Sequence, residues 1–459
     1  MKKKISFFSL VLLVIAAIDS IRNLPAAALF GPSLIFFFTL AAVLFLIPTA
    51  LVAAELAGTF PEKGGVYHWV QMAFGDKLGM LAIWLQWINT MVWYPTILSF
   101  IAGTLAYLVN PDLAQSEGYI ATVVISVFWI LTIVNLFGLN FSAKVNSLCA
   151  LIGTVFPMII LIGLGLIWAF TGQPLQIELT RETIVPNLMN SRNWISLVAI
   201  MASFLGMELS GVHVSDIRDP QRNFPKAIFL AAFFILTTMV LGSIAIAFVL
   251  PDNEISLVAG VMQVFTNFFA TFHMEWCIPI LTILIVVGSV GGIINWLISP
   301  AKGLLHASEF GFMPTFFTKK NRYGTPARIL IAQAILVTIF CSVFLLVPSV
   351  NTFYWFLMAL STALYMLMYV LMFGAALCLH HRYKERPKTF KIPFNNVGMY
   401  VTCFLGLVGC GLTLFVGFFP PDEIEVTSIS TYSTMIAFGL ISMTAPVLLF
   451  YRYRNARRS

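Results

Sequence analysis

Charged side chains are scarce in this sequence. Asp, Glu, Lys and Arg make up 10% of 459 residues, whereas hydrophobic residues make up 59%, and the mean hydropathy is +0.93. About a quarter of the residues are charged in an ordinary soluble protein, so that class is excluded. The apolar runs are too long to be the alternating strands of a β-barrel. We therefore expect an all-α polytopic membrane protein.

Motifs for catalysis and for metal binding are also missing. The sequence contains no Gly-rich phosphate loop, no zinc-type histidine spacing and no nucleophile elbow. Its six cysteines are scattered through apolar runs without metal-ligand spacing, and we expect them to be packing residues. Hence a membrane enzyme is not supported, and neither a cofactor nor a metal ion is expected.

Apolar runs are what the sequence has instead. A helix needs roughly 20 residues to cross a hydrocarbon core of about 30 Å. Twelve runs meet this length, and they predict twelve transmembrane helices at residues 6–29, 33–57, 78–108, 119–139, 146–170, 194–217, 227–250, 275–300, 329–347, 353–379, 397–418 and 430–451.

The basic residues predict the orientation of these spans. With both termini in the cytoplasm, all but three of the 26 basic residues lie on the cytoplasmic side, as they do in most membrane proteins. Arg181 and Arg192 fall outside, and Arg22 lies within a span. The net charge of +7 therefore reflects orientation, and a nucleic-acid partner is not expected. The outer loops instead carry acids: Asp112, Glu117, Asp252, Glu254, Asp422, Glu423 and Glu425.

The first span is interrupted by polar residues. Asp19, Arg22 and Asn23 precede Pro25, which has no N–H to donate and disfavours a helix before it. We expect an unwound segment from Ser20 to Leu24, whose free amides and carbonyls could receive the carboxylate and ammonium of a zwitterion. The alternative is a plain proline kink in which Asp19 and Arg22 pair with each other.

The sixth span is interrupted at Glu208, which follows Gly206 and precedes Ser210 and Gly211. A carboxylate at that depth is costly and indicates a function. Glu208 could read an amino group, relay a proton or hold the first span by a hydrogen bond. His213 is more simply a structural group than a proton relay. The following DIRDPQRNFPK, at 216–226, predicts a helix start with a salt-bridge cluster that could also close an inner gate.

Three inner linkers carry further predictions. Residues 60–77, FPEKGGVYHWVQMAFGDK, predict a short helix on the inner membrane surface, and residues 302–328 predict a second one. The basic run HHRYKERPKTFKIP, at 380–393, is interpreted as a membrane anchor. In the eighth span, Gly291, Gly292 and Pro300 predict close helix approach and local bending.

Six stretches together carry a resemblance that extends over nearly the whole chain. They are LPAAALFGPSLIFFF at 24–38, AAELAGTFPEKGGVYHWV at 53–70, MELSGVHVSDIRDPQRNFPKA at 207–227, VLPDNEISLVAGVMQVF at 249–265, NWLISPAKG at 295–303 and FFPPDEIEVTSISTY at 418–432. With these the chain resembles bacterial amino-acid antiporters of the amino acid, polyamine and organocation superfamily. It is most similar to the glutamate/γ-aminobutyrate antiporter group.

The resemblance implies one transporter domain over 1–459 with two inverted repeats of five helices. The first repeat would cover 6–170 and the second 194–379, with two further helices in 397–451. The first and sixth helices would be broken and would enclose the substrate near the middle of the membrane. The implied substrate-binding residues are Ser20, Ile21, Arg22, Asn23, Leu24, Phe204, Leu205, Gly206, Met207 and Glu208. The implied gating residues are Trp296, Tyr365 and Tyr369.

One departure from that group bears on the substrate. Arg22 and Asn23 stand where the antiporters carry an aromatic residue and an acid, and an arginine there would favour an added carboxylate and repel a diamine. We expect a secondary active antiporter of glutamate-like amino acids in the bacterial inner membrane, working by alternating access. Proton-coupled uptake, exchange of neutral or basic amino acids, and a substrate-gated channel or sensor stay open as alternatives. Protons and a homodimer are open as partners.

Overall fold

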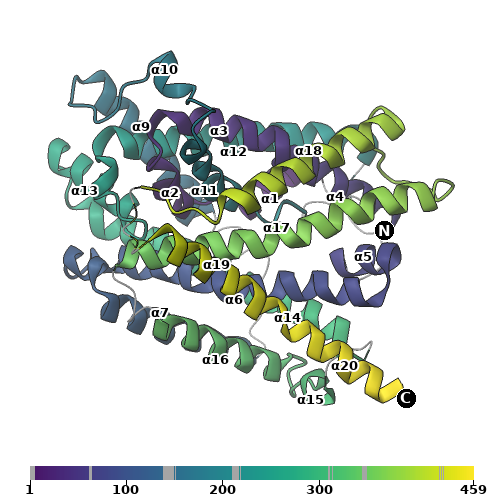
Figure 1. Ribbon diagram of the computed structural model, residues 1–459. Helices are drawn as coiled ribbons and strands as arrows, with labels where there is room; N and C mark the ends of the chain where they lie inside the picture. Colours follow the sequence, from purple (N-terminus) through teal and green to yellow (C-terminus); the bar gives the residue numbers. More distant parts are fainter. Residues whose placement is uncertain are drawn as a thin grey trace.

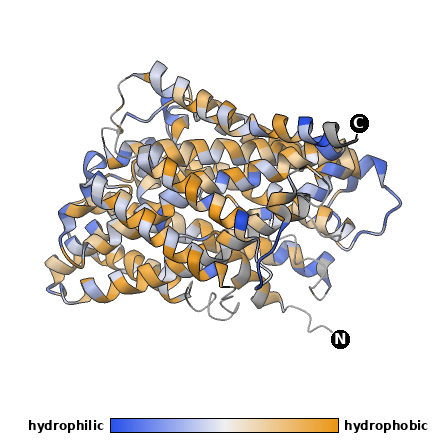
Figure 2. Cartoon of the chain, turned by 90° about the horizontal axis from the view of Figure 1, so that it is seen from below, coloured by the Kyte–Doolittle hydropathy of each residue, from blue (hydrophilic) through white to orange (hydrophobic). Residues whose placement is uncertain are grey.

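The computed structural model describes residues 6–60, 65–137, 149, 151–208, 217, 219–308, 311–312, 314–343, 349–422, 424, 426 and 428–458. Every regular element in these ranges is a helix. The long helices run side by side, and both chain ends lie at the same end of the bundle in two views (Figures 1 and 2). Hydrophobic residues dominate along the helices, whereas hydrophilic ones gather toward the ends of the bundle (Figure 2). This distribution fits a protein that spans a membrane.

Within these described ranges, seven helical stretches are long and apolar enough to cross a membrane, and two further apolar helices are shorter. They confirm the all-helical polytopic class, while the number twelve stays a prediction. The helices that correspond to the expected spans, apart from the first and sixth, are α3 (Leu34–Ala41) continued through a π-helix into α4 (Ile47–Thr59), α6 (Asp76–Ala106), α7 (Glu117–Leu136), α9 (Phe156–Phe170), α12 (Pro220–Val249), α14 (Cys277–Ser308), α16 (Ala327–Val343), α17 (Val350–Arg382), α18 (Asn395–Val416), and α19 (Ile429–Thr444) followed by α20 (Pro446–Arg458).

Three long helices form the centre of the bundle. α6 packs along both α17 and α14, and α12 packs against α9 and the N-terminal helix α1 (Phe7–Ile18). Many side chains of α17 are buried, including Tyr365 and Tyr369. Because the hydrocarbon core offers no hydrophobic force between helices, such contacts depend on close packing and on hydrogen bonds.

Small residues let α14 approach its neighbour closely. A Cβ added to Gly288 would lie 2.4 Å from the Cα of Gly153, and one added to Gly291 would lie 2.6 Å from the Cβ of Cys149. No larger residue fits at these positions without moving the backbone. The expected close approach at Gly291 is therefore confirmed, and Cys149 is a packing residue there.

The inner linkers differ from their predictions in part. Helix α5 (Val66–Phe74) forms as expected, but it packs against α6 and α17 and buries Tyr67 and Trp69. In the second linker α14 continues to Ser308, and only the short α15 (Thr315–Thr318) follows. In place of one longer helix, the described part of this linker holds the end of α14 and the four residues of α15, so the position of a helix on the inner membrane surface stays a prediction.

The basic run 380–393 is not a simple lipid anchor. The Nζ of Lys388 lies 2.5 Å from Oε1 of Glu55, and the Nδ1 of His380 lies 2.9 Å from the same oxygen. The backbone N–H of Ile392 donates to Oε2 of Glu55 at 2.8 Å. Glu55, on α4, is buried and therefore needs these partners. The linker is thus held to the end of α4 by a buried ion pair.

Candidate functional site

The first span is broken, and the break lies one turn before its proline. α1 ends at Ile18, Ser20 is extended with φ −145° and ψ 116°, and a 3-10 turn over Ile21–Asn23 leads into α2 (Leu24–Ala28). Leu24 is helical, so Pro25 does not unwind the residue before it as we expected. Pro25 instead occupies the first turn of the new helix, where its missing N–H removes no hydrogen bond.

Asp19 and Arg22 do not pair with each other. Oδ2 of Asp19 accepts a hydrogen bond of 3.0 Å from Thr238 on α12, whereas Nη1 of Arg22 donates one of 2.9 Å to Thr96 on α6. The guanidinium also lies over the ring of Trp93, 5.3 Å from its centroid. The interpretation as a plain kink with an internal ion pair is therefore wrong, because two different helices hold the two charges.

The sixth span is broken as well. α11 (Ser196–Ala202) is followed by a turn at 203–206, in which Gly206 has φ +95°. Such a backbone conformation favours glycine because it has no Cβ. The N–H of Gly206 donates to the hydroxyl of Tyr369 at 3.0 Å, so a side chain replaces the helical partner that this amide has lost.

Glu208 is buried behind this turn and is held by α6 and α17. The hydroxyl of Tyr365 donates to its Oε1 at 2.7 Å, the hydroxyl of Tyr369 donates to its Oε2, and Nε2 of Gln86 lies 3.3 Å from Oε1. Of the three roles considered for Glu208, this geometry favours holding by hydrogen bonds. The partners lie on α17 and α6, whereas the alternative weighed from the sequence was a hydrogen bond to the first span. The neighbouring Ser210, Gly211, His213, Asp216 and Arg218 lie outside the described residues.

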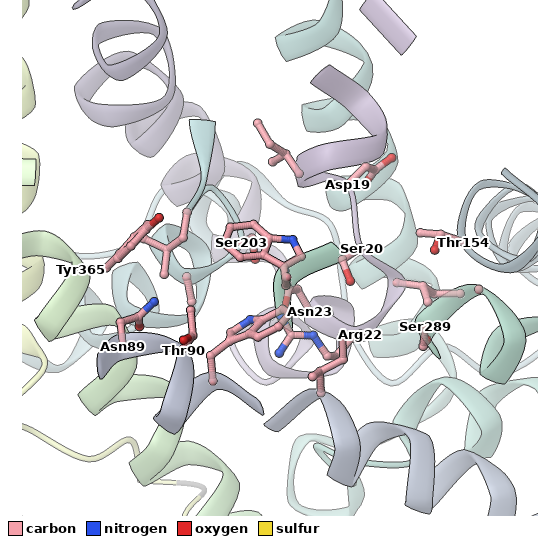
Figure 3. A pocket seen from close by; sticks show the side chains of 18 residues that line it. Asp19, Ser20, Arg22, Asn23, Asn89, Thr90, Thr154, Ser203, Ser289 and Tyr365 are labelled. Atoms are coloured by element: carbon pink, nitrogen blue, oxygen red, sulfur yellow. The ribbon is translucent and has the colours of Figure 1, made fainter. Parts of the chain in front are cut away.

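A cavity of about 120 Å³ lies between the two breaks. Four segments supply its walls: the break after α1, the end of α11, the middle of α6 and the middle of α14, with single residues from α17 and from the π-helix before α9 (Figure 3). It is lined by Ile18, Asp19, Ser20, Ile21, Arg22, Asn23, Asn89, Thr90, Trp93, Ile97, Thr154, Ala202, Ser203, Leu205, Gly288, Ser289, Trp296 and Tyr365.

The cavity brings together part of the expected site. Seven of the thirteen residues line it: Ser20, Ile21, Arg22, Asn23, Leu205, Trp296 and Tyr365. The other six do not line it and pack nearby: Leu24, Phe204, Gly206, Met207, Glu208 and Tyr369.

Three of those six residues make packing contacts behind the cavity. Leu24 lies against Gly242 on α12, Phe204 lies edge-on to Phe38, and Tyr369 lies edge-on to Phe45. These contacts fix the two broken helices from behind. Among the expected residues, the cavity wall therefore comes mainly from the first span.

Several polar residues of the wall were not expected. Asn89 and Thr90 face the cavity from α6, Thr154 from the π-helix before α9, and Ser289 from α14 (Figure 3). Asn89 is held by Ser361 of α17, whose hydroxyl lies 2.5 Å from Oδ1. In the sequence, each of these positions interrupts an apolar run with one or two polar residues. Such residues also occur at helix contacts away from any site, so this signal alone does not identify a lining residue.

Among the described residues that line the cavity, only Arg22 and Asp19 are charged. Both are buried, and within the described residues Nε of Arg22 and Oδ1 of Asp19 have no hydrogen-bond partner. A buried charge without full compensation is costly and marks a functional site in a membrane. The described residues contain no cluster of three His, Cys, Asp or Glu side chains that could hold a metal ion.

Three known proteins similar to this chain are named as transporters. The chain is 39% identical to an uncharacterized transporter of Legionella pneumophila over 440 residues, which cover 96% of this chain and 95% of the relative. It is 28% identical to a glutamate/γ-aminobutyrate antiporter of Lactococcus lactis over 99% of this chain and 92% of that protein. A probable agmatine/putrescine antiporter of the same species is 25% identical over 85% and 83% of the two chains.

The broken helices, the buried charges between them and these relatives lead to one family. Residues 5–442 match the family described as amino acid permease. The match covers nearly the whole chain, so the resemblance found in the sequence is confirmed at this level. The chain belongs to the amino acid permease family.

Proposed function

We propose that the protein is a secondary active antiporter that exchanges glutamate-like amino acids by alternating access. The observation that carries the proposal is Arg22, a buried arginine in the wall of the cavity whose Nε has no partner within the described residues. A guanidinium binds carboxylates through two parallel N–H donors. The relatives named as glutamate/γ-aminobutyrate antiporters support the same substrate class.

Arg22 is held in place for this role. Thr96 accepts from Nη1, and the ring of Trp93 lies beneath the guanidinium plane, so the side chain is positioned before a substrate arrives. Preorganisation of this kind lowers the entropic cost of binding. The Nε of Arg22 has no hydrogen-bond partner within the described residues and can donate to a carboxylate. A dicationic diamine would meet the positive charge of Arg22 instead, so we place diamines outside the substrate range.

Twelve transmembrane spans in two inverted repeats are part of this proposal. The first repeat covers 6–170, the second 194–379, and the last two spans 397–451. Both repeats begin with a short helix and a break, α1 with Asp19 and Ser20 in the first and α11 with 203–206 in the second. Breaks at matching positions support an inverted repeat, because such folds place the substrate between two discontinuous helices.

We place the protein in the bacterial inner membrane with both termini in the cytoplasm. Both ends of the described chain lie at one end of the bundle, which supports an even number of spans (Figure 1). The basic residues of the linkers support the cytoplasmic assignment of that end. The proposal leaves two partners open, namely protons as co-substrates and a second copy of the chain in a homodimer.

The gating residues are proposed to be Trp296, Tyr365 and Tyr369. Trp296 lines the cavity and lies 5.5 Å from Trp93, centroid to centroid, at the edge where Arg22 is held. Tyr365 and Tyr369 join α17 to Glu208 of the broken sixth span. A rotation of the two broken helices against α17 would either break these hydrogen bonds or move the two tyrosines together with Glu208. Either result couples gating to the substrate site.

Counterflow in proteoliposomes tests the proposal. Purified protein is reconstituted with glutamate inside, and labelled glutamate, γ-aminobutyrate, alanine, lysine or agmatine is offered outside at acidic and neutral pH. We expect accumulation of glutamate and γ-aminobutyrate only in loaded vesicles. Uptake into empty vesicles driven by a pH gradient would instead identify proton-coupled uptake. Exchange confined to neutral or basic amino acids would contradict the proposed substrate class, and flux without saturation would identify a channel.

A further inference from the structure

The cavity wall carries a second charge that the proposed function does not use. Asp19, directly after α1, is 6% exposed and is one of the residues that line the same cavity as Arg22. Figure 3 shows the two residues on either side of Ser20. The extended backbone at Ser20 separates them, so they do not share a helix face as residues three apart in a continuous helix would.

The hydrogen bonding of Asp19 is incomplete. Within the described residues its side chain accepts from the hydroxyl of Thr238, and that hydroxyl also lies 3.0 Å from the carbonyl oxygens of Phe234 and Ile235. A threonine hydroxyl has a single proton, so the three acceptors share one donor. Oδ1 of Asp19 has no partner within the described residues. A buried carboxylate in this state is costly unless a cation joins it.

The end of α1 adds to the negative potential at this place. The last carbonyl groups of a helix lack intrahelical partners, and the helix dipole is negative there. α1 ends at Ile18, directly before Asp19. A cation with hydrogen-bond donors, such as an ammonium group, would therefore be attracted by both the carboxylate of Asp19 and the negative end of the helix.

We infer that Asp19 binds the ammonium group of the substrate while Arg22 binds its carboxylate, so that the cavity selects zwitterions. The inference rests on the proposed function and adds the second recognition group. The two charges are held apart by Thr238 on α12 and Thr96 on α6, which keeps them from neutralising each other. A molecule with one ammonium and one carboxylate supplies an ionic partner to both Asp19 and Arg22. A carboxylic acid without the amino group leaves the charge of Asp19 without a partner.

Deaminated analogues test this inference on the unaltered protein. Unlabelled γ-aminobutyrate and butyrate, and glutamate and glutarate, compete against labelled substrate in the counterflow assay. We expect each amino compound to inhibit at least about tenfold more strongly than its deaminated analogue, as a charged hydrogen bond implies. Equal inhibition within each pair would overturn the inference even where exchange itself is observed. Absence of exchange with every amino compound would overturn the proposed function, a separate result.

Two variants then assign the selectivity to Asp19. Asp19→Asn keeps an acceptor for Thr238 but removes the charge, and we expect the ratio within each pair to fall to about one to two. Thr238→Val keeps the carboxylate and removes its protein partner, so the ratio should persist if Asp19 contacts the ligand. A purely structural Asp19 predicts that both variants behave alike. Asp112→Asn, at an exposed position, is the matched control, and an unchanged ratio in Asp19→Asn contradicts the inference.

Discussion

The hydroxyl of Tyr365 donates a hydrogen bond of 2.7 Å to Oε1 of Glu208, across the contact between the broken sixth span and α17. Tyr365 lines the cavity and Glu208 does not. Within the described residues, the buried acid thus reaches the cavity wall only through the tyrosine. We therefore expect Glu208, the most conspicuous carboxylate within the predicted spans, to position the site, while the substrate contacts we propose come from the first span.

Replacing Glu208 should therefore destabilise the protein. Glu208→Ala leaves the hydroxyl donors of Tyr365 and Tyr369 without their acceptor, at a cost of about 1–3 kcal/mol for each buried group. Glu208→Gln retains an acceptor oxygen and should lose less. The midpoint of thermal unfolding in detergent ranks the two variants by stability. Glu178→Ala, in an exposed loop, is the control. A normal midpoint for Glu208→Ala would show that the acid does not hold the helices together.

Replacing Arg22 should remove transport and leave the fold intact. In Arg22→Ala the hydroxyl of Thr96 keeps its own acceptor, the carbonyl of Trp93 at 2.8 Å, so Thr96 is not left as an unpaired buried donor. Loss of a buried charged contact to a carboxylate costs about 2–5 kcal/mol, which predicts a fall of at least about 30-fold in exchange. Initial counterflow rates measure the fall, and elution of the purified variant as a single peak checks folding.

Two control variants make the Arg22 result specific. Arg22→Lys keeps the charge but not the two-pronged geometry, so an intermediate rate is expected. Arg181→Ala removes an exposed arginine and should leave exchange unchanged. Transport at the normal rate by Arg22→Ala would remove the observation on which the proposed function depends.

A methyl group at Gly206 should strain the broken sixth span. The added Cβ would lie 3.4 Å from the ring of Trp296, an ordinary contact, so the cost comes from the backbone at φ +95° and is about 1–2 kcal/mol. Gly163→Ala in the interior of α9 is the matched control, because nothing lies within 4 Å and its helical backbone favours alanine. Thermal midpoints that fall for Gly206→Ala and hold or rise for Gly163→Ala would support this explanation. Equal effects would exclude it.

The buried ion pair between α4 and the 380–393 linker should be sensitive to the loss of one partner. Glu55→Ala leaves Lys388, whose side chain is 11% exposed, without its carboxylate, and such losses cost about 3–5 kcal/mol. The double variant Glu55→Leu, Lys388→Met replaces both charges by apolar groups and should recover part of this. Recovery stays partial because the N–H of Ile392 also loses its acceptor. Denaturant midpoints of Glu55→Leu, of Lys388→Met and of the double variant give the coupling, and strictly additive losses would show that the pair contributes nothing.

The positions at which the two broken helices are interrupted could be predicted from the sequence. Which residues near each interruption line the cavity could not. Arg22 and Asn23 were expected in the site and line the cavity, whereas Glu208 was expected there and lies behind it. Asn89 and Thr154 were not expected, although both line the cavity. Each is a single polar residue in an apolar run, and the sequence holds many of these at helix contacts.

The sequence by itself determined that the chain enters a membrane, where its helices are interrupted, and which loops carry its positive charge, because hydrophobic length and basic residues act locally. Tertiary structure alone decided which way each helix is turned. A helix surrounded by lipid and by other apolar helices has no hydrophilic face that fixes its rotation, so packing and hydrogen bonds between distant segments fix it. Thr238 therefore holds Asp19, and Thr96 holds Arg22, from helices far away in the sequence. Separated in this way, two charges three residues apart line one cavity without neutralising each other.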